Sequence, residues 1–210
     1  LEKAAHVGDY LCSEKVQSED GAYRSKGTHY TAVIYPAKSM LELVAAERGL
    51  IGSPLWKERY VRHKESAERA IDDLLLRLDN IQTEGDMTFE DGMITCSALQ
   101  LALRALLEGD SARRERYTSA AAYLMGKHQC LEQQLIPDCR MRGGTLRYWE
   151  ALDVYFVPNQ VMNSPHGWTA WKIYACYYLY LLTGEVRYLS DFMDTLGACC
   201  LLYTSPSPRD

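Results

Sequence analysis

The sequence lacks the motifs by which many enzyme classes are recognised. It contains no GxGxxG, P-loop, GxSxG or HExxH pattern, so dinucleotide, nucleotide, serine-hydrolase and zinc-protease chemistry are not indicated. Its seven cysteines form no CxxC pair and no Cys/His cluster with zinc-ligand spacing. We interpret them as small buried hydrophobic residues without a disulfide framework. We therefore expect neither a cofactor nor a metal.

Long apolar runs and strand patterns are also missing. The longest apolar run, 173–182, is too short to cross a bilayer, which takes ~20 residues. Runs of β-branched residues are short, and alternation of polar and apolar residues never persists. The sequence therefore predicts an all-α protein without a membrane-spanning segment.

The composition that remains is that of a globular protein. The 210 residues, 47% of them hydrophobic and 24% charged, are enough for one domain or part of a larger one. The net charge is −5, and Lys and Arg are spread along the chain, which argues against nucleic acid or an anionic membrane as a partner. Tyrosine (15) far exceeds phenylalanine (3), which suits sugar-binding clefts but equally suits ordinary helix packing.

Three segments share one layout, in which two helices are joined by a short turn. Apolar residues recur at helical spacing within them, as Ala67, Ala70, Ile71 and Leu74 do. The predicted helix pairs are 32–49 with 55–79, 93–107 with 112–134, and 168–182 with 186–199. Two longer loops, 81–92 and 135–167, separate the pairs, and the second is rich in aromatic residues. Ordered loops of this length are usually functional.

The two ends of the chain call for separate treatment. Residues 1–17 are expected to be the end of a preceding outer helix, and the true N-terminus is expected to be missing, which leaves periplasmic, secreted and cytoplasmic locations in a bacterium open. The segment 200–210 resembles the translation of a transposase adapter used in shotgun sequencing. We therefore divide the chain into a partial domain, 1–199, and a non-native tail, 200–210.

Chemistry-bearing residues gather where each loop enters the first helix of a pair. These junctions read Thr-His-Tyr at 28–30, Thr-Phe-Glu-Asp-Gly at 88–92, and Asn-Ser-Pro-His-Gly-Trp at 163–168. Short turns on one side and long loops on the other resemble the six-hairpin glycosidase superfamily of carbohydrate-active enzymes. The resemblance covers about residues 20–199 and implies an (α/α)6-type toroid, of which about half the ring is present. It also implies that the three junctions face one cleft.

Glu90 and Asp91 are the best candidates for a catalytic carboxylate. The positive end of a helix dipole favours an ionised carboxylate, as a base or nucleophile requires. Adjacent residues point in different directions, so these two are not expected to form the carboxylate pair of glycoside hydrolysis. Asp153 and Glu150 are possible partners. An ordinary helix cap explains the same two residues equally well.

His166 lies at another predicted helix start, where the dipole favours its neutral form. Asn163 is placed to bind a sugar hydroxyl or a uronate carboxylate. With Tyr155 or Tyr148 as the acid, His166 would suit a polysaccharide lyase. A structural histidine, hydrogen-bonded within a loop, is the plain alternative.

Aromatic residues are the remaining candidates for substrate binding. Trp149, in a loop, is a better subsite candidate than Trp168 and Trp171, which share a helix face and also suit core packing. The other substrate-binding candidates are Tyr155, His29 and Tyr30.

The sequence thus favours a glycoside hydrolase that cleaves glycosidic bonds in poly- or oligosaccharides. A lyase acting on uronate-containing glycans and a non-catalytic α-hairpin binding scaffold are the alternatives. Oligomeric state is left open. A partial ring is expected to be inactive alone and to expose apolar flanks.

Overall fold

The computed structural model describes residues 1–23, 31–79, 81, 91–132, 142–144 and 169–204, with backbone alone at 31–33, 91, 169 and 201–204. Within these ranges the chain is all-α, as predicted, and Gln17 and Tyr23 form an isolated β-bridge. The elements are α1 (Glu2–Leu11), α2 (Thr31–Glu47), η1 (Arg48–Leu50), α3 (Pro54–Leu76), α4 (Asp91–Leu107), α5 (Ser111–His128), η3 (Gln129–Leu131), α7 (Thr169–Thr183) and α8 (Val186–Thr204).

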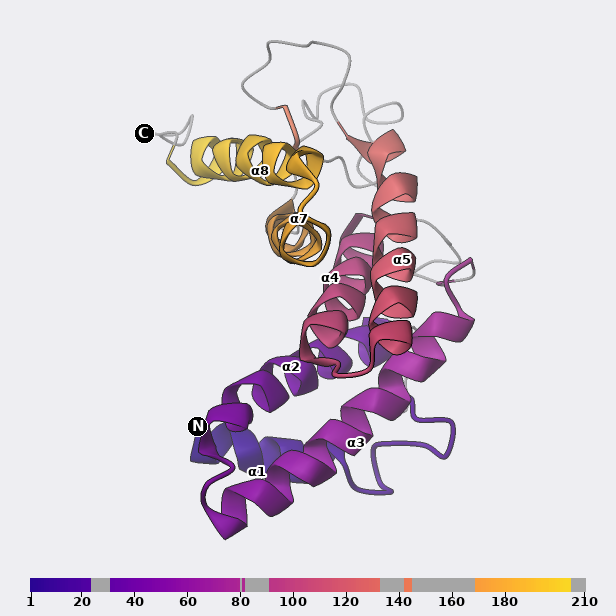
Figure 1. Ribbon diagram of the computed structural model, residues 1–210, viewed down its shortest axis with the longest axis vertical. Coiled ribbons are helices and arrows are strands. Elements are labelled where there is room, and N and C mark those ends of the chain that lie inside the picture. Colours follow the sequence, from indigo (N-terminus) through magenta and orange to yellow (C-terminus); the bar gives the residue numbers. More distant parts are fainter. Residues whose placement is uncertain (24–30, 80, 82–90, 133–141, 145–168, 205–210) are drawn as a thin grey trace, which may run out of the picture.

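The three predicted hairpins are confirmed as α2/α3, α4/α5 and α7/α8 (Figure 1). Their turns carry the signals expected of helix ends. Pro54 occupies the first turn of α3, where its missing N–H costs nothing. The Asp110 side chain caps α5 by accepting from the Arg113 N–H at 2.8 Å. Gly184 ends α7 with φ +71°, and its N–H bonds the Tyr180 carbonyl.

Helix α4 is the centre of the core. Every described side chain from residues 92 to 105 is buried, and α4 packs against α5, α7, α2 and α3. Helix α4 is mostly apolar, and its buried polar side chains have partners, as Ser97, Gln100 and Arg104 show. The described helices that begin each hairpin, α2, α4 and α7, therefore form an inner row, with α4 between its neighbours.

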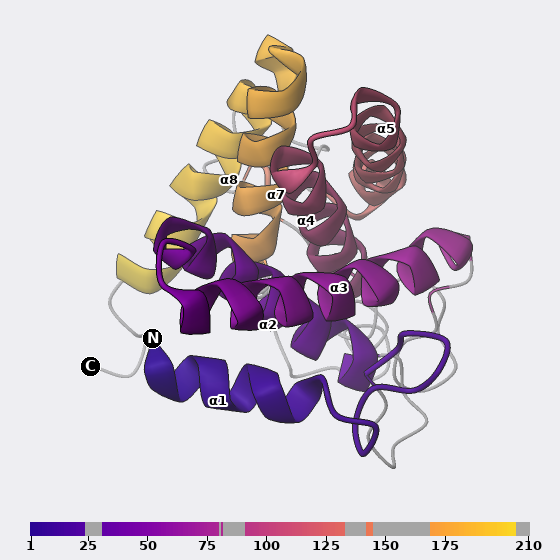
Figure 2. The same cartoon turned by 60° about the horizontal axis from the view of Figure 1, so that its bottom comes forward.

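The inner row gives the array two distinct ends. In Figure 2, α4 and α7 lie side by side, and the turns that lead to α5 and α8 are both at the upper end of the view. We call the end with the turns 108–110 and 184–185 the short-turn end. The opposite end, which we call the long-connection end, holds the starts of α4 and α7 and the end of α5. It is also where the chain leaves for 133–168 and returns.

Three boundaries differ from the prediction. Helix α5 ends at His128 rather than at residue 134, and the short helix η3 follows it. Helix α1 stops at Leu11 rather than near residue 17, because the chain then turns back on itself. The buried Gln17 side chain donates to the carbonyls of Gly21 and Ser66, and this ties the loop to α3. Helix α8 continues to Thr204, so the helical pattern extends into the segment set apart as a tail. The origin of that segment stays a prediction.

The cysteines are more varied than expected. In the described part of the chain, Cys12, Cys96, Cys130 and Cys176 are free thiols. Cys96, Cys176 and Cys199 are buried as predicted, but Cys130 and Cys200 are exposed, which corrects the prediction that all are buried hydrophobic residues. Burial raises the pKa of Cys96 and of Cys176 to about 12, so both stay protonated thiols near neutral pH.

Candidate functional site

Most residues predicted for the site lie outside the described part of the chain. These are His29, Tyr30, Glu90, Trp149, Tyr155, Asn163, His166 and Trp168, together with Tyr148, Glu150 and Asp153. Asp91 is described as the first residue of α4, without its side chain. What the structure does test is where the helices begin. Helices α2 and α7 begin directly after Tyr30 and Trp168, and the 88–92 junction includes the first two residues of α4, so each junction lies at the start of the first helix of a pair.

The starts of α2 and α7 meet. Tyr35, the fifth residue of α2, packs against Trp171, the third residue of α7, with ring centroids 5.1 Å apart and planes tilted by 46°. In the same region the Gln100 side chain of α4 donates to the Ile34 carbonyl of α2 at 3.1 Å. Trp171 is therefore an interhelical packing residue. The contact brings the beginnings of two inner helices together at the long-connection end.

A buried lysine occupies the next position of α7. Lys172 is 1% exposed, and its Nζ lies 2.9 Å from Glu132 Oε1 and 3.2 Å from the Gly143 carbonyl oxygen. A buried ammonium group without partners would be strongly destabilising, so these two contacts are what allows it to be buried. We refer to Lys172, Glu132, His128, Gly143 and Thr195 as the Lys172 cluster.

Glu132 contacts two basic side chains, Lys172 and His128. Its Oε1 also lies 3.2 Å from Nδ1 of the fully buried His128, on the last turn of α5. Burial alone would raise the pKa of Glu132, but the His128 hydrogen bond and the Lys172 charge outweigh it and hold the pKa below its usual range. Glu132 is therefore an ionised partner for Lys172 at neutral pH.

Gly143 packs closely against the backbone of α8. Its carbonyl accepts from Lys172 and, at 3.3 Å, from the Thr195 hydroxyl. Its φ is +79°, and a Cβ added there would lie 2.8 Å from the Thr195 backbone nitrogen. Glycine is required on both counts. The Lys172 ammonium group thus contacts both residue 132 and residue 143. It holds these two positions of the connection close together.

Asp191 of α8 has the opposite electrostatic environment. It is half-buried, and this burial raises its pKa, an effect that the Lys172 charge only partly offsets. The two carboxyl groups near Lys172 therefore have pKa values shifted in opposite directions, an arrangement also found in acid–base sites. Glu132 Oε1 already contacts both Lys172 and His128, so anchoring the connection is what the described geometry supports.

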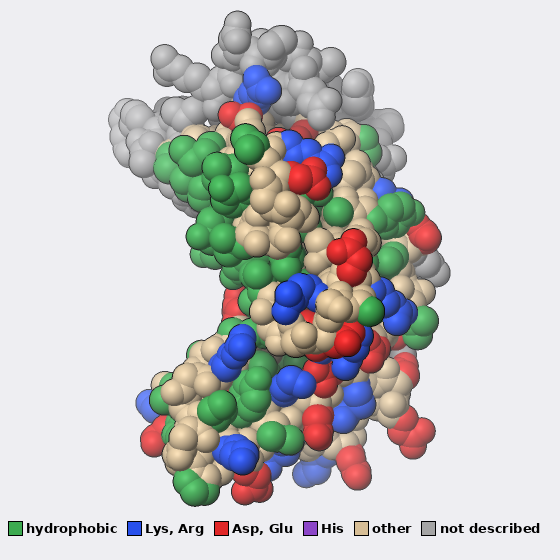
Figure 3. Space-filling model, in the orientation of Figure 1, with side chains coloured by type: hydrophobic (Ala, Val, Ile, Leu, Met, Phe, Trp, Pro, Cys, Tyr) green, Lys and Arg blue, Asp and Glu red, His purple; other side chains and the backbone are tan. Residues whose placement is uncertain are grey.

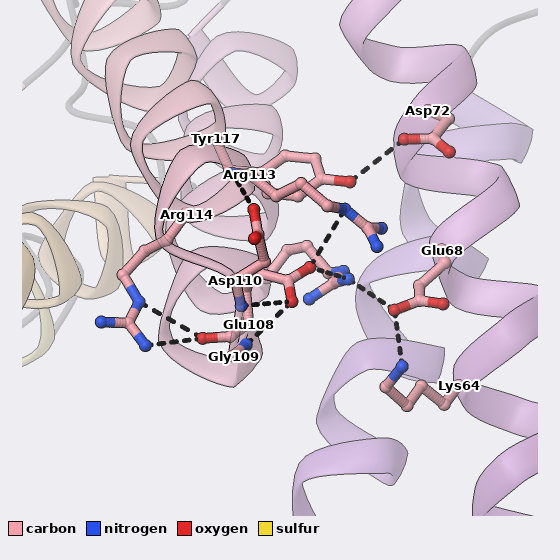
Figure 4. A network of polar contacts seen from close by, with 10 residues as sticks. Lys64, Glu68, Asp72, Glu108, Gly109, Asp110, Arg113, Arg114 and Tyr117 are labelled. Atoms are coloured by element: carbon pink, nitrogen blue, oxygen red, sulfur yellow. Dashed lines mark hydrogen bonds and ion pairs between the residues drawn. The ribbon is translucent and has the colours of Figure 1, made fainter.

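The short-turn end has a charged network of its own (Figure 4). Arg104 of α4 has a side chain 3% exposed and donates through Nη2 to Glu68 of α3 at 2.5 Å and to Glu108 at 2.6 Å. Glu108 Oε1 accepts from the backbone N–H groups of Gly109 and Asp110. We call these residues the Arg104 network. It locks the α4–α5 turn onto α3.

Sequence reasoning missed both Lys172 and Arg104, although a usable signal was present. Lys172 is the single charged residue of α7, and Arg104 is the single cationic residue of α4. An isolated charge in an otherwise apolar helix has to be neutralised wherever that helix is buried. That rule would have marked both positions without identifying their partners.

A third buried group joins α1 to the first hairpin. His63 of α3 is fully buried, with Nδ1 2.9 Å from Glu47 Oε1 and Nε2 3.0 Å from Asp9 Oδ1. Asp9 also pairs with Arg59 and Arg62. Both ring nitrogens of His63 face carboxylate oxygens, one on α2 and one on α1. This group fixes α1, which buries little apolar surface.

The described residues offer few alternatives for ligand chemistry. Within them, no group of three or more His, Cys, Asp or Glu side chains is arranged to hold a metal ion. A small pocket between α2, α3 and α4, lined by Leu41, Val44, Tyr60 and others, is adjacent to the Arg104 network. No helix in the described ranges has the length and hydropathy needed to cross a membrane.

Comparisons with known protein families, with curated proteins and with solved structures found no match to this chain.

Proposed function

We propose that this chain is part of a carbohydrate-active enzyme of the helical-hairpin type, a glycoside hydrolase whose substrate site lies at the long-connection end. The observation that carries the proposal is the meeting of α2 and α7 through Tyr35 and Trp171. A single site built from three junctions requires the inner helices to begin close together.

The Lys172 cluster supports the same end of the molecule. Burying an ammonium group is destabilising unless the group is paired. The partners of Lys172 lie on a long connection rather than in a hairpin turn. Binding sites need loops that a rigid scaffold positions. A connection fixed at Glu132 and Gly143 has such a scaffold in α7 and α8.

The proposed roles follow the sequence. Glu90 or Asp91 acts as the catalytic carboxylate, and the start of α4 at Asp91 supports this because a helix N-terminus stabilises negative charge. His166 and Asn163 bind the substrate. The sugar subsites are formed by Trp149, Tyr155, Trp168, His29 and Tyr30. An (α/α)6-type toroid would provide the remainder of the ring.

The test is to incubate the chain with neutral and uronate-containing polysaccharides and to measure both new reducing ends and ultraviolet absorbance. A hydrolase yields reducing ends without absorbance, whereas a lyase adds the absorbance of a new C=C bond. Glu90→Gln and Asp91→Asn test the carboxylates. Glu65→Gln, on the exposed face of α3, is the matched control.

Calorimetric titration with the same glycans separates the remaining outcomes. Because a partial ring is expected to be inactive alone, glycan binding that is weakened by Trp149→Ala supports the proposal even without any product. Absence of binding with every glycan would contradict the proposal and leave the α-hairpin scaffold as the better account.

A further inference from the structure

Helix α2 has one open side, which begins where the helix meets α7. Tyr35, Lys38 and Glu42 recur at spacings of three and seven residues, so they lie on one face of α2. Tyr35 packs against Trp171 of α7, and farther along the same face the Glu42 side chain is 52% exposed. Lys38 donates to Glu42 at 2.8 Å. This face of α2 is therefore polar but carries no net charge.

Helix α7 carries a stripe with the same spacing. Trp171, Tyr174 and Tyr178 are also three and seven residues apart, so the stripe starts at the contact with Tyr35 and continues along one face. The rings of Tyr174 and Tyr178 have centroids 6.2 Å apart, and Tyr174 is exposed while Tyr178 is half-buried. All three side chains are aromatic, and they form the side of α7 that is turned toward α2.

A groove lies between the two stripes, and its floor is α4, which packs against both α2 and α7. The charges of Lys38 and Glu42 act in opposite directions on the Cys96 thiol of α4. Burial raises the pKa of Tyr178, and the negative charge of Glu42 adds to the rise. The ion pair of α2 thus lies close to the floor and faces the aromatic stripe. Figure 3 shows the molecule hollowed on the left of the view, between α7 and α2.

This groove has one closed end. We call its six wall residues, Tyr35, Lys38, Glu42, Trp171, Tyr174 and Tyr178, the inner groove. The packing of Tyr35 against Trp171 closes it at the long-connection end, where α2 and α7 begin. Farther along the two helices, exposed Glu42 and Tyr174 show that neither wall is covered by the other.

We propose that the inner groove binds a neutral oligosaccharide, with sugar rings against Tyr174 and Tyr178 and hydroxyl groups toward Lys38 and Glu42. This inference rests on the proposed function, for which it names the substrate class. A sugar ring has an apolar face and a polar rim, and the inner groove offers an aromatic wall and a charged wall. Its closed end adjoins the proposed site, so one glycan chain can reach both.

The charge of the inner groove favours a neutral glycan over a uronate. Lys38 is the one cation among the six residues, and it is already paired with Glu42. A uronate carboxylate would compete with Glu42 for Lys38 and would meet like charge. A sugar hydroxyl can instead donate to the Glu42 carboxylate and accept from the Lys38 ammonium group.

The inner groove is also compatible with the proposed ring. In a ring, the next hairpin would pack on the side of α7 that is turned away from α4. The inner groove lies on the side that α2, α4 and α7 share, which would face the ring axis. Completing the ring would therefore leave the groove open.

The test is calorimetric titration of the 1–210 chain with neutral oligomers of glucose, xylose and mannose and with oligogalacturonate. We expect a neutral oligomer to bind more tightly than oligogalacturonate. Tyr174→Ala and Tyr178→Ala should each weaken that binding at least about tenfold, because each removes a stacking ring. Tyr123→Ala, which removes a 46% exposed ring from α5, is the matched control and should leave the affinity unchanged.

Glu42→Gln separates a binding role from a structural one. The variant frees Lys38 from its carboxylate partner, so the affinity for oligogalacturonate should rise while the affinity for the neutral oligomer falls. Glu65→Gln, on the exposed face of α3, is the matched control. A parallel fall in both affinities, or no change in either, would contradict the role given to Glu42.

Circular dichroism checks that each variant remains helical. A neutral glycan that binds wild type and both tyrosine variants equally well would overturn this inference and leave the proposed function standing. Tighter binding of oligogalacturonate by wild type would overturn the substrate class. Binding of no glycan would overturn the proposed function and this inference with it. If Tyr174→Ala instead abolished self-association of the chain, the groove would be a protein interface and the inference would be wrong.

Discussion

The two ends of the helical array use buried cations for different purposes. At the short-turn end, Arg104 pairs with Glu68 and Glu108, which belong to a neighbouring helix and to the turn itself. At the long-connection end, Lys172 pairs with Glu132 and Gly143, which flank a part of the long connection. The first network fixes a hairpin, and the second fixes the base of a long segment. The difference suggests that stability depends on one end and ligand binding on the other.

Removing Lys172 or Arg104 in turn should distinguish the two ends of the array most clearly. Lys172→Met leaves Glu132 buried without its nearest cation and should lower the free energy of unfolding by about 3 to 5 kcal/mol. Chemical denaturation measures the loss. In this variant the rate of hydrogen exchange should increase more at residues 142–144 than at the backbone N–H groups of Gly109 and Asp110. In Arg104→Met the order should reverse, and equal acceleration at both ends in either variant would contradict the distinction.

Two glycines with positive φ, one at each end of the array, allow a second comparison of the two ends. Gly143→Ala must place a Cβ against the α8 backbone as well as adopt a left-handed conformation, which we expect to cost about 3 kcal/mol. Gly184→Ala, in the α7–α8 turn, has nothing within 4 Å of the added Cβ and should cost about 1 kcal/mol from backbone strain alone. Thermal unfolding of the two variants provides the comparison. A Gly143→Ala variant as stable as Gly184→Ala would argue against close packing of the connection.

Acid should affect the Lys172 cluster through Glu132. Its pKa is lowered in the folded protein, so its stabilising contribution is present above the ordinary value of 4.5 and is lost as pH falls through the folded pKa. Glu132→Gln should therefore cost about 2 kcal/mol at neutral pH, in line with a hydrogen bond to charged groups. The difference from wild type should vanish at low pH. Denaturation as a function of pH tests this, and a pH-independent difference would exclude the ionic role.

The smallest effect is expected at the α5 cap. Asp110→Ala removes the hydrogen bond to the Arg113 N–H and should cost about 1 kcal/mol. Asp110→Asn keeps an acceptor and should recover most of that loss. Thermal unfolding measures both variants. If the two lost the same stability, the cap would be acting through charge rather than through its hydrogen bond.

Sequence reasoning predicted the helices well because periodicity and turn chemistry are local. The α4–α5 turn was located from Gly109 and Asp110, and the α7–α8 turn from Gly184. The end of α1 was misplaced because it depends on Gln17 reaching Ser66, 49 positions away, which no local pattern records. The extension of α8 to Thr204 was missed because the whole of 200–210 was set apart for its resemblance to a sequencing adapter.

The site was predicted less completely. The three junctions were located correctly with respect to the inner helices, since a helix start has a local signature. The Lys172 cluster was not predicted because its members come from four separate stretches, around residues 128–132, 143, 172 and 195. The roles proposed for Glu90, Asp91, His166 and Asn163 stay predictions.

Hydrogen exchange of the full chain, with and without a panel of neutral and uronate-containing oligosaccharides, tests the central claim most directly. The claim is that the ligand site lies at the long-connection end. A binding glycan should then slow exchange at residues 142–144 and in the first turns of α4 and α7, while the turns at 48–53, 108–110 and 184–185 stay unchanged. Slowing at those turns instead, or no change with any glycan, would contradict the account.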